Sequence, residues 1–230
     1  MGYEVIHVSQ SPRHKWLGLM NIPFDHVIDI GANEGQFFEK FSNDFGNPVT
    51  ADLFEPIPEM IERLRRKWKT GSITIHPFAL GSQNTSAKLN MHVNHLPSSS
   101  LLQAQVDAAI FETIDISDQK QIEIEVRRID DVVDIESLEQ KSCILMKLDV
   151  QGFELEVLKG AHSTLGLVHA VLTEINFDTL YENQASFSEI VNYLKGFDFQ
   201  YAGSISQALG SNGRCIYVDA VFYKQAFFQR

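Results

Sequence analysis

Two carboxylates of this chain, Asp149 and Glu174, stand where chemistry is expected. Each ends an apolar run, 143–150 and 168–175, typical of a buried parallel strand. Ligands of a doubly wound sheet bind beyond the carboxyl ends of its strands, where the strand order reverses. We therefore predict that Asp149 contacts a substrate or takes its proton, and that Glu174 is the second candidate for this role. Either residue could instead cap a helix or hold a loop.

A glycine-rich turn follows another apolar run within residues 27–35. The turn lacks the G-x-G-x-x-G pattern of dinucleotide sites and the Gly-Lys-Ser/Thr of phosphate loops, and its Asp29 and Glu34 would repel a pyrophosphate. These carboxylates suit a ligand with an ammonium group and a sulfonium centre, such as S-adenosylmethionine, and the glycines would let the backbone approach it. An ordinary strand-to-helix turn is the alternative. The turn residues predicted to contact the ligand are Asp29, Gly31, Ala32, Asn33 and Gly35.

An acidic residue, Glu55, ends the next apolar run, 49–54, and lies 20 residues beyond Gly35. At the tip of the second strand of a nucleotide-binding βαβ unit, such a residue accepts hydrogen bonds from both ribose hydroxyls. Pro56 then marks the start of a helix. Glu55 alone could be a capping carboxylate, but its pairing with the glycine turn favours a ribose contact.

Five segments, taken together and in order, resemble the FkbM family of S-adenosylmethionine-dependent methyltransferases: residues 27–35, 54–56, 76–81, 98–101 and 147–154. The resemblance covers about residues 24–180. It implies an α/β fold of the Rossmann-like class I type, with a seven-stranded, mostly parallel sheet of order 3-2-1-4-5-7-6, an antiparallel seventh strand and helices on both faces. It also implies methyl transfer, mostly to hydroxyls of sugars, glycolipids or polyketides.

The matched segments extend the predicted site. One departure is Gln151, where family members commonly have Glu, which argues against an acid-base role at that position. The cofactor-binding set gains Pro56, Ala79 and Leu80, and the predicted substrate-binding residues are Ser99, Ser100, Lys147 and Gly152.

A long connection, residues 80–141, separates the third expected strand (73–78) from the fourth. It has far more residues than a plain crossover between two strands needs. Segments 86–93 and 121–126 alternate polar and apolar residues, which predicts a pair of strands. The stretch between them holds Leu101, Leu102, Val106, Ile110 and Phe111. We expect it to form an ordered lid over the cofactor, with a disordered surface insertion as the alternative. Segments 197–202 and 216–223 read as the last strands.

Composition predicts a single domain over residues 1–230, with an N-terminal extension at 1–23: the chain is 44% hydrophobic and has only two cysteines, both expected to be reduced. The formal net charge is −11, and the one basic cluster, 63–67, reads as a solvated helix face. Nucleic acid is therefore a poor substrate and a neutral or cationic small molecule or glycan a better one. The start of the chain lacks a signal-peptide pattern and no stretch is long enough for a membrane span, so we expect a cytoplasmic protein.

Magnesium is a further possibility, because Asp149, Glu174 and Asn176 would offer oxygen ligands from adjacent strand ends. Carboxylates beside a cationic cofactor need no metal, so we do not expect one. Two other functions compete with methyl transfer: an NAD-dependent oxidoreductase, which would also use Glu55 but has a different glycine pattern, and a non-catalytic nucleotide-binding module on the same fold. The sequence leaves the acceptor and the oligomeric state open.

Overall fold

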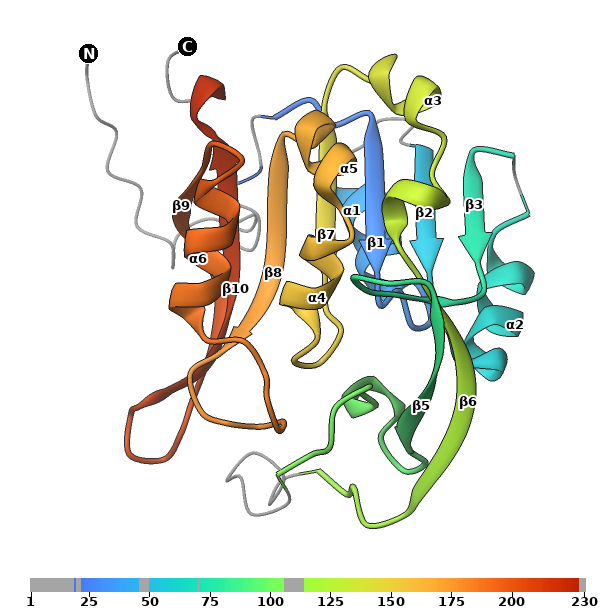
Figure 1. The fold of residues 1–230 in the computed structure, drawn as a ribbon, viewed down its shortest axis with the longest axis vertical. Coiled ribbons are helices and arrows are strands. Elements are labelled where there is room, and N and C mark those ends of the chain that lie inside the picture. Colours follow the sequence, from blue (N-terminus) through green and yellow to red (C-terminus); the bar gives the residue numbers. More distant parts are fainter. Residues whose placement is uncertain (1–18, 20–21, 46–49, 70, 106–113, 228–230) are drawn as a thin grey trace.

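The computed structural model describes residue 19 and residues 22–45, 50–69, 71–105 and 114–227. Seven strands form its main sheet: β1 (His26–Ile30), β2 (Thr50–Phe54), β3 (Ile73–His76), β7 (Ile144–Leu148), β8 (Ala170–Asn176), β9 (Phe199–Leu209) and β10 (Cys215–Lys224). Their order is β3-β2-β1-β7-β8-β10-β9 (Figure 1). Neighbouring strands pair in parallel, except that β10 is antiparallel to both β8 and β9. The predicted order 3-2-1-4-5-7-6 is confirmed.

Helices cover both faces of this sheet, as predicted: α1 (Gln36–Phe45) and α2 (Pro58–Lys67) on one face and α4 (Glu154–Lys159), α5 (His162–Leu167) and α6 (Phe187–Lys195) on the other (Figure 1). Successive β1 residues point to opposite faces. Val27 joins the core cluster of Phe38 and Phe41 from α1, whereas Ile28 joins that of Leu165 and Leu194. All five β1 residues are buried, as expected of a parallel strand covered on both faces.

The long connection forms a second sheet of β4 (Ala79–Leu80), β5 (Thr85–His92) and β6 (Gln119–Arg127), in the order β4-β6-β5. Strands β5 and β6 are antiparallel, which confirms the predicted pair. This sheet extends beyond the carboxyl ends of β1 and β2 (Figure 1). The helices α3 (Ile135–Glu139), η3 (Leu96–Ser98) and η5 (Ile129–Asp131) complete the connection. Val106, Ile110, Phe111 and nearly all of the 1–23 extension lie outside the described residues.

Residues 94–105 of the connection are tied to the rest of the protein by backbone hydrogen bonds. Asn90 and Ser100 exchange two of them, from N to O at 2.8 and 3.1 Å. Beyond Ser100, the N–H of Gln105 donates to the carbonyl of Leu180, and the N–H of Glu182 donates to the carbonyl of Gln103. This described part is therefore an ordered cover over the strand tips, as predicted, and not a loose insertion. Within the described residues, no helix is long and apolar enough to cross a bilayer.

Candidate active site

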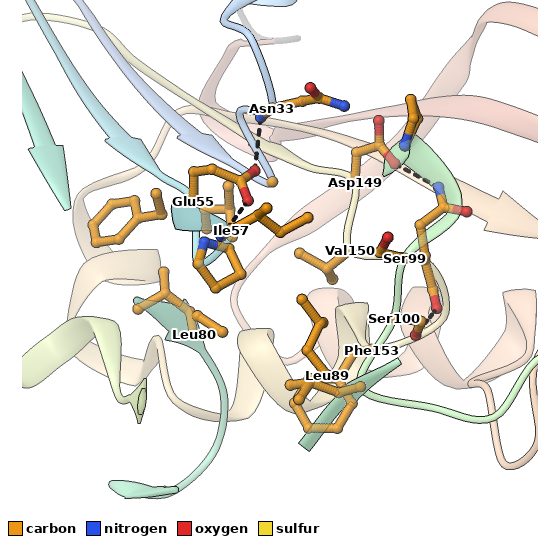
Figure 2. Close-up of a pocket in the computed structure, with 18 of the residues that line it drawn as sticks. Asn33, Glu55, Ile57, Leu80, Leu89, Ser99, Ser100, Asp149, Val150 and Phe153 are labelled. Atoms are coloured by element: carbon orange, nitrogen blue, oxygen red, sulfur yellow. Dashed lines mark hydrogen bonds between the residues drawn. The ribbon is translucent and has the colours of Figure 1, made fainter. Parts of the chain in front are cut away.

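A cavity opens where the tips of β1, β2 and β7 meet residues 94–105 of the long connection, here called the inserted segment (Figure 2). It encloses about 710 Å³ including its open mouth. Figure 2 shows Glu55 and Asp149 on opposite sides of this first cavity, with Leu89 and Phe153 together at its lower edge. The apolar part of its wall includes Ile57, Leu80, Leu89, Leu101 and Phe153, and the polar part includes Asn33, Glu55, Ser99, Ser100, Asp149 and Gln151.

Glu55 directly follows β2 and is buried beside the first cavity. Its Oε1 accepts a hydrogen bond from the N–H of Ile57 at 2.8 Å, and its Oε2 accepts one from the N–H of Asn33 at 2.9 Å. Burial raises the pKa of Glu55 to about 7, against the effect of these two donors. Each carboxylate oxygen can accept a second hydrogen bond. The geometry thus fits the predicted ribose contact, and Glu55 also joins the glycine turn to the start of α2, in line with the capping alternative.

The glycines of the turn serve packing between neighbouring elements. Gly31 has φ +76°, and a Cβ added to it would lie 2.0 Å from the backbone oxygen of Asp149. Gly35 has φ +75°, and its Cβ would lie 3.0 Å from side-chain atoms of both Leu64 and Trp68. The expectation that these glycines let the backbone approach a ligand is therefore corrected in its reason: at both positions, other parts of the protein occupy the space that a side chain would need. Gly31 and Asn33 still line the first cavity.

A second cavity lies on the other side of Asp149, between α1 and the strands β8, β9 and β10. It shares Gly31, Asn33, Pro97 and Asp149 with the first cavity. Asp149 therefore stands where a molecule in one cavity would meet a molecule in the other. Further residues around the second cavity are Ala32, Phe37, Lys40, Lys147, Glu174, Ile205, Ser206 and Asp219.

The two predicted catalytic carboxylates meet through Gln151. The Nε2 of Gln151 donates to Oδ1 of Asp149 at 2.8 Å and to Oε1 of Glu174 at 3.2 Å. Burial raises the pKa of Glu174 well above its usual range, and the negative charge of Asp149 adds to this effect. The side chain of Asp149 is the more accessible of the two, because it is 40% exposed and open to both cavities. This leaves Asp149 as the better base.

Lys147 and Asp29 form a buried pair, so Asp29 is not aimed at a ligand as predicted, whereas Lys147 also lines the second cavity. The Nζ of Lys147 lies 3.1 Å from Oδ1 of Asp29 and 3.6 Å from Oδ2 of Asp149, and it donates to the backbone oxygen of Gly31 at 2.9 Å. Asp29 and Lys147 are neighbours because β1 and β7 pair in that register. Asp29 is fully buried and lines neither cavity. Glu34, also expected to face the ligand, pairs with Arg63 on the surface.

The other predicted substrate-binding residues divide into two groups. Ser99 and Ser100 line the first cavity, but their hydroxyls are engaged: Oγ of Ser99 accepts from the N–H of His92, and Oγ of Ser100 donates to the backbone oxygen of Gln151 at 2.6 Å. Gly152 lines neither cavity, and a Cβ there would meet Leu102, Tyr181 and Gln184 at 3.1–3.2 Å. Gly152 is thus placed in the packing under the inserted segment. Of the predicted cofactor residues, Pro56, Ala79 and Leu80 line the first cavity.

The three proposed magnesium ligands are not brought together. Asn176 lines a separate pocket with Phe177 and Phe187. Between Asp149 and Glu174, the place of a bridging cation is taken by the amide of Gln151, which donates to both. No group of three or more His, Cys, Asp or Glu suited to a metal ion occurs among the residues that the structure describes.

Two residues that the sequence analysis missed support the loop after β7. Glu154 is buried, and its Oε1 accepts from the N–H groups of Val150 and Gly152, each at 3.1 Å. Burial raises the pKa of Glu154 to about 7. Tyr181 is fully buried, and its hydroxyl donates to Oε1 of Gln151 at 2.7 Å. Glu154 lies inside a matched motif and could have been noticed, whereas no sequence pattern marks Tyr181.

The first cavity has the chemistry that S-adenosylmethionine requires. The apolar side chains Leu80, Leu89 and Phe153 offer a surface for a flat ring, and Glu55 offers carboxylate oxygens for a diol. From there the cavity continues past the turn at Gly31 to the negative charge of Asp149, which suits a cationic centre.

Comparison with known proteins agrees with this geometry. A family model, the methyltransferase FkbM domain, matches residues 29–201. The 2-O-methyltransferase NoeI of Sinorhizobium fredii (strain NGR234) is 25% identical over 191 residues, which cover 79% of this chain and 76% of NoeI. Methyltransferase 1 of Beauveria bassiana is 23% identical over 146 residues, 58% of this chain and 57% of that protein.

Among solved structures, methyltransferase FkbM from Methylobacillus flagellatus matches with a TM-score of 0.55 at 18% identity, over 90% of this chain and 45% of that protein. The chain thus spans less than two thirds of the length of both Methyltransferase 1 and the Methylobacillus flagellatus protein. The family model covers well over half of this chain and includes the glycine turn, Glu55 and Asp149. The chain belongs to the FkbM family of methyltransferases, and its sheet is that of the Rossmann-like class I fold.

Proposed function

We propose that this methyltransferase binds S-adenosylmethionine in the first cavity and transfers the methyl group to a hydroxyl of a small molecule or glycan held in the second cavity. The observation that carries the proposal is the position of Asp149, which lines both cavities at the tip of β7. A group that removes the proton of an acceptor hydroxyl must lie at such a junction.

S-adenosylmethionine would supply a methyl group already activated by its sulfonium. The protein's own contribution is mainly to position the donor and the acceptor, and then to take one proton. Asp149 would accept that proton, because it is the more exposed carboxylate of its pair. Glu55 would hold the ribose hydroxyls, and the inserted segment, through Leu101 and Ser99, would exclude water from the first cavity.

A hydroxylated, uncharged acceptor is favoured by the composition of the second cavity. Three carboxyl groups, Asp149, Glu174 and Asp219, line it and outnumber its two lysines, Lys40 and Lys147, and the net charge of the chain is −11. Carboxyl groups repel anionic substrates and make strong hydrogen bonds with hydroxyls. The relative NoeI, by its name, methylates an oxygen. A sugar or glycolipid hydroxyl is therefore our first choice of acceptor, with a polyketide-like hydroxyl second.

Calorimetry followed by a transfer assay tests the proposal. S-adenosylhomocysteine should bind the purified protein, whereas NAD should not, because the turn lacks the dinucleotide pattern. Transfer of a radiolabelled methyl group should then be measured on sugars and glycolipids and on their amino-sugar counterparts. Binding without transfer to any acceptor would favour a non-catalytic module. Tight NAD binding, or transfer to the amines alone, would contradict the proposal.

A further inference from the structure

We infer that Gln151 is a positioning residue that fixes the carboxylate of Asp149 for proton removal, and that the hydroxyl of Tyr181 in turn fixes Gln151. The inference rests on the proposed function and goes beyond it, because it assigns a role to two residues that need not touch the substrate or the cofactor. It starts from hydrogen bonds that join three elements: the β7 tip, β8 and the loop between β8 and α6.

The amide of Gln151 has both of its ends engaged. Its Nε2 donates to Asp149 and to Glu174, and its Oε1 accepts from Tyr181. Turning the amide around would place its oxygen against the carboxylate of Asp149. The carboxylate therefore determines which end of the amide faces it, and the hydroxyl of Tyr181, which also lies 3.0 Å from the backbone oxygen of Ser98, holds the other end. With Oδ1 of Asp149 held by this donor, Oδ2 remains for an acceptor hydroxyl.

The backbone of Gln151 shows that its placement is specific. Its φ is +56°, in the left-handed region that side-chain-bearing residues seldom adopt. Such a conformation persists where the surroundings hold it, and it often occurs at functional sites. Here the backbone oxygen of Gln151 accepts from the hydroxyl of Ser100 in the inserted segment. Gln151 thus joins the cover of the first cavity to the proposed base.

A neutral amide at this position also limits the negative charge of the site. The charged groups that influence Glu174 are Asp149, Glu154 and Asp219, which raise its pKa, and Lys147, which lowers it. Burial and the charges of Glu174 and Asp149 also raise the pKa of two tyrosines, Tyr181 and Tyr217. A glutamate at position 151 would remove the N–H donors from Asp149 and Glu174 and add a carboxyl group between them. Both changes make the cluster hold its protons to higher pH.

The test compares Gln151→Glu and Tyr181→Phe with the wild type. In Gln151→Glu, kcat should fall at least tenfold and the acidic limb of its pH profile should move to higher pH, while the Kd for S-adenosylhomocysteine changes less than about twofold. In Tyr181→Phe, kcat should fall about threefold to tenfold, as expected for the loss of one hydrogen bond, with the acceptor KM unchanged. Gln200→Glu, which adds the same charge at an exposed position of β9, is the control and should match the wild type.

A second readout needs neither cofactor nor turnover. In protein labelled with ¹³C at the carboxyl groups of Asp and Glu, the resonance of Glu174 should titrate at higher pH in Gln151→Glu than in the wild type. Wild-type kcat and wild-type titration in either folded variant would overturn the inference, and Tyr181→Phe decides it if Gln151→Glu does not fold. If the wild type transfers no methyl group, the proposed function fails, and the titration still decides the role of Gln151.

Discussion

The Nζ of Lys147 lies 3.1 Å from Oδ1 of Asp29, and both side chains are buried beneath the glycine turn. Burial alone would lower the pKa of Lys147, but the charges of Asp29 and Asp149 outweigh it and raise this pKa. The pair joins the central strands β1 and β7, and the same ammonium group also holds the backbone oxygen of Gly31. Lys147 thus stabilises the strands and the glycine turn that carry the site.

Lys147→Met should therefore destabilise the protein. The substitution leaves Asp29 buried without its partner, which costs about 3–5 kcal/mol in comparable pairs. Urea denaturation followed by circular dichroism measures the free energy of unfolding. The double variant Asp29→Asn, Lys147→Met is the control and should recover part of the loss, because it removes both charges. An unchanged denaturation midpoint for Lys147→Met would show that the pair does not stabilise the fold.

Cofactor binding should strengthen as the pH rises through about 7. The pKa of Glu55 is raised to about 7 by burial, and its ionised form is the better acceptor for ribose hydroxyls. We expect the Kd for S-adenosylhomocysteine to be about tenfold higher at pH 6 than at pH 8, measured by calorimetry. Glu55→Gln should bind more weakly and lose this dependence.

Glu154→Gln provides a matched control for that experiment. Glu154 also has a pKa raised to about 7, but it lines neither cavity. Its variant should keep the pH dependence of the wild type. If Glu55→Gln retained the dependence as well, Glu55 would not be the group that binding requires in its ionised form.

Glu154 itself should make the fold less stable as the pH rises. Its pKa is about 7 in the folded protein and 4.5 as its ordinary value, so the folded state binds the proton more tightly. The free energy of unfolding should then fall between about pH 4.5 and pH 7. Glu154→Gln should flatten this fall because the amide does not ionise, and its oxygen can still accept both N–H groups that Oε1 accepts now. Denaturation curves across this pH range measure the effect. If the free energy of unfolding fell with pH as steeply in the variant as in the wild type, the prediction would be wrong.

Gly31→Ala should destabilise the protein by about 2–5 kcal/mol. The new Cβ would lie 2.0 Å from the backbone oxygen of Asp149, and φ is +76°. The estimate adds the cost of a left-handed residue to that of overpacking. Thermal unfolding measures the effect. Gly166→Ala is the control, because a Cβ there meets nothing within 4 Å inside α5, and it should be neutral or slightly stabilising. Similar melting temperatures for the two variants would contradict the prediction.

Asp149→Asn should separate catalysis from binding. The variant keeps the shape of the side chain but cannot take a proton, so kcat should fall about a hundredfold or more. The affinity for S-adenosylhomocysteine should change little, and both quantities are measured on the same preparation. Full activity on the true acceptor would remove Asp149 as the base and leave proximity as the main source of rate.

EDTA distinguishes a base from a metal ligand in that experiment. Because Gln151 occupies the space between Asp149 and Glu174, we expect wild-type activity to be unaffected by the chelator. Loss of activity that magnesium restores would instead assign these carboxylates to a metal.

The sequence by itself was sufficient for the strands of the main sheet and for the resemblance to the family, and that resemblance supplied the strand order. Apolar runs and glycine turns are local signals in the sequence. Once they show where a strand ends, an acidic residue at that position is placed at the strand tip. Asp149, Glu174 and Glu55 were identified in this way. The partners of these residues were not, because they come from distant parts of the chain that meet only in three dimensions.

Tertiary structure decided what each polar residue faces. Asp29 and Lys147 both occur in motifs of the family, yet strand register pairs them with each other and leaves Asp29 outside the lining of both cavities. Gly31 is required by the backbone of Asp149, 118 positions further along the chain. Gln151 gains its role from Tyr181 and Glu174, which no spacing connects to it. The local sequence pattern determines the position of a side chain within its strand, helix or turn. Packing between these elements determines which residues that side chain contacts.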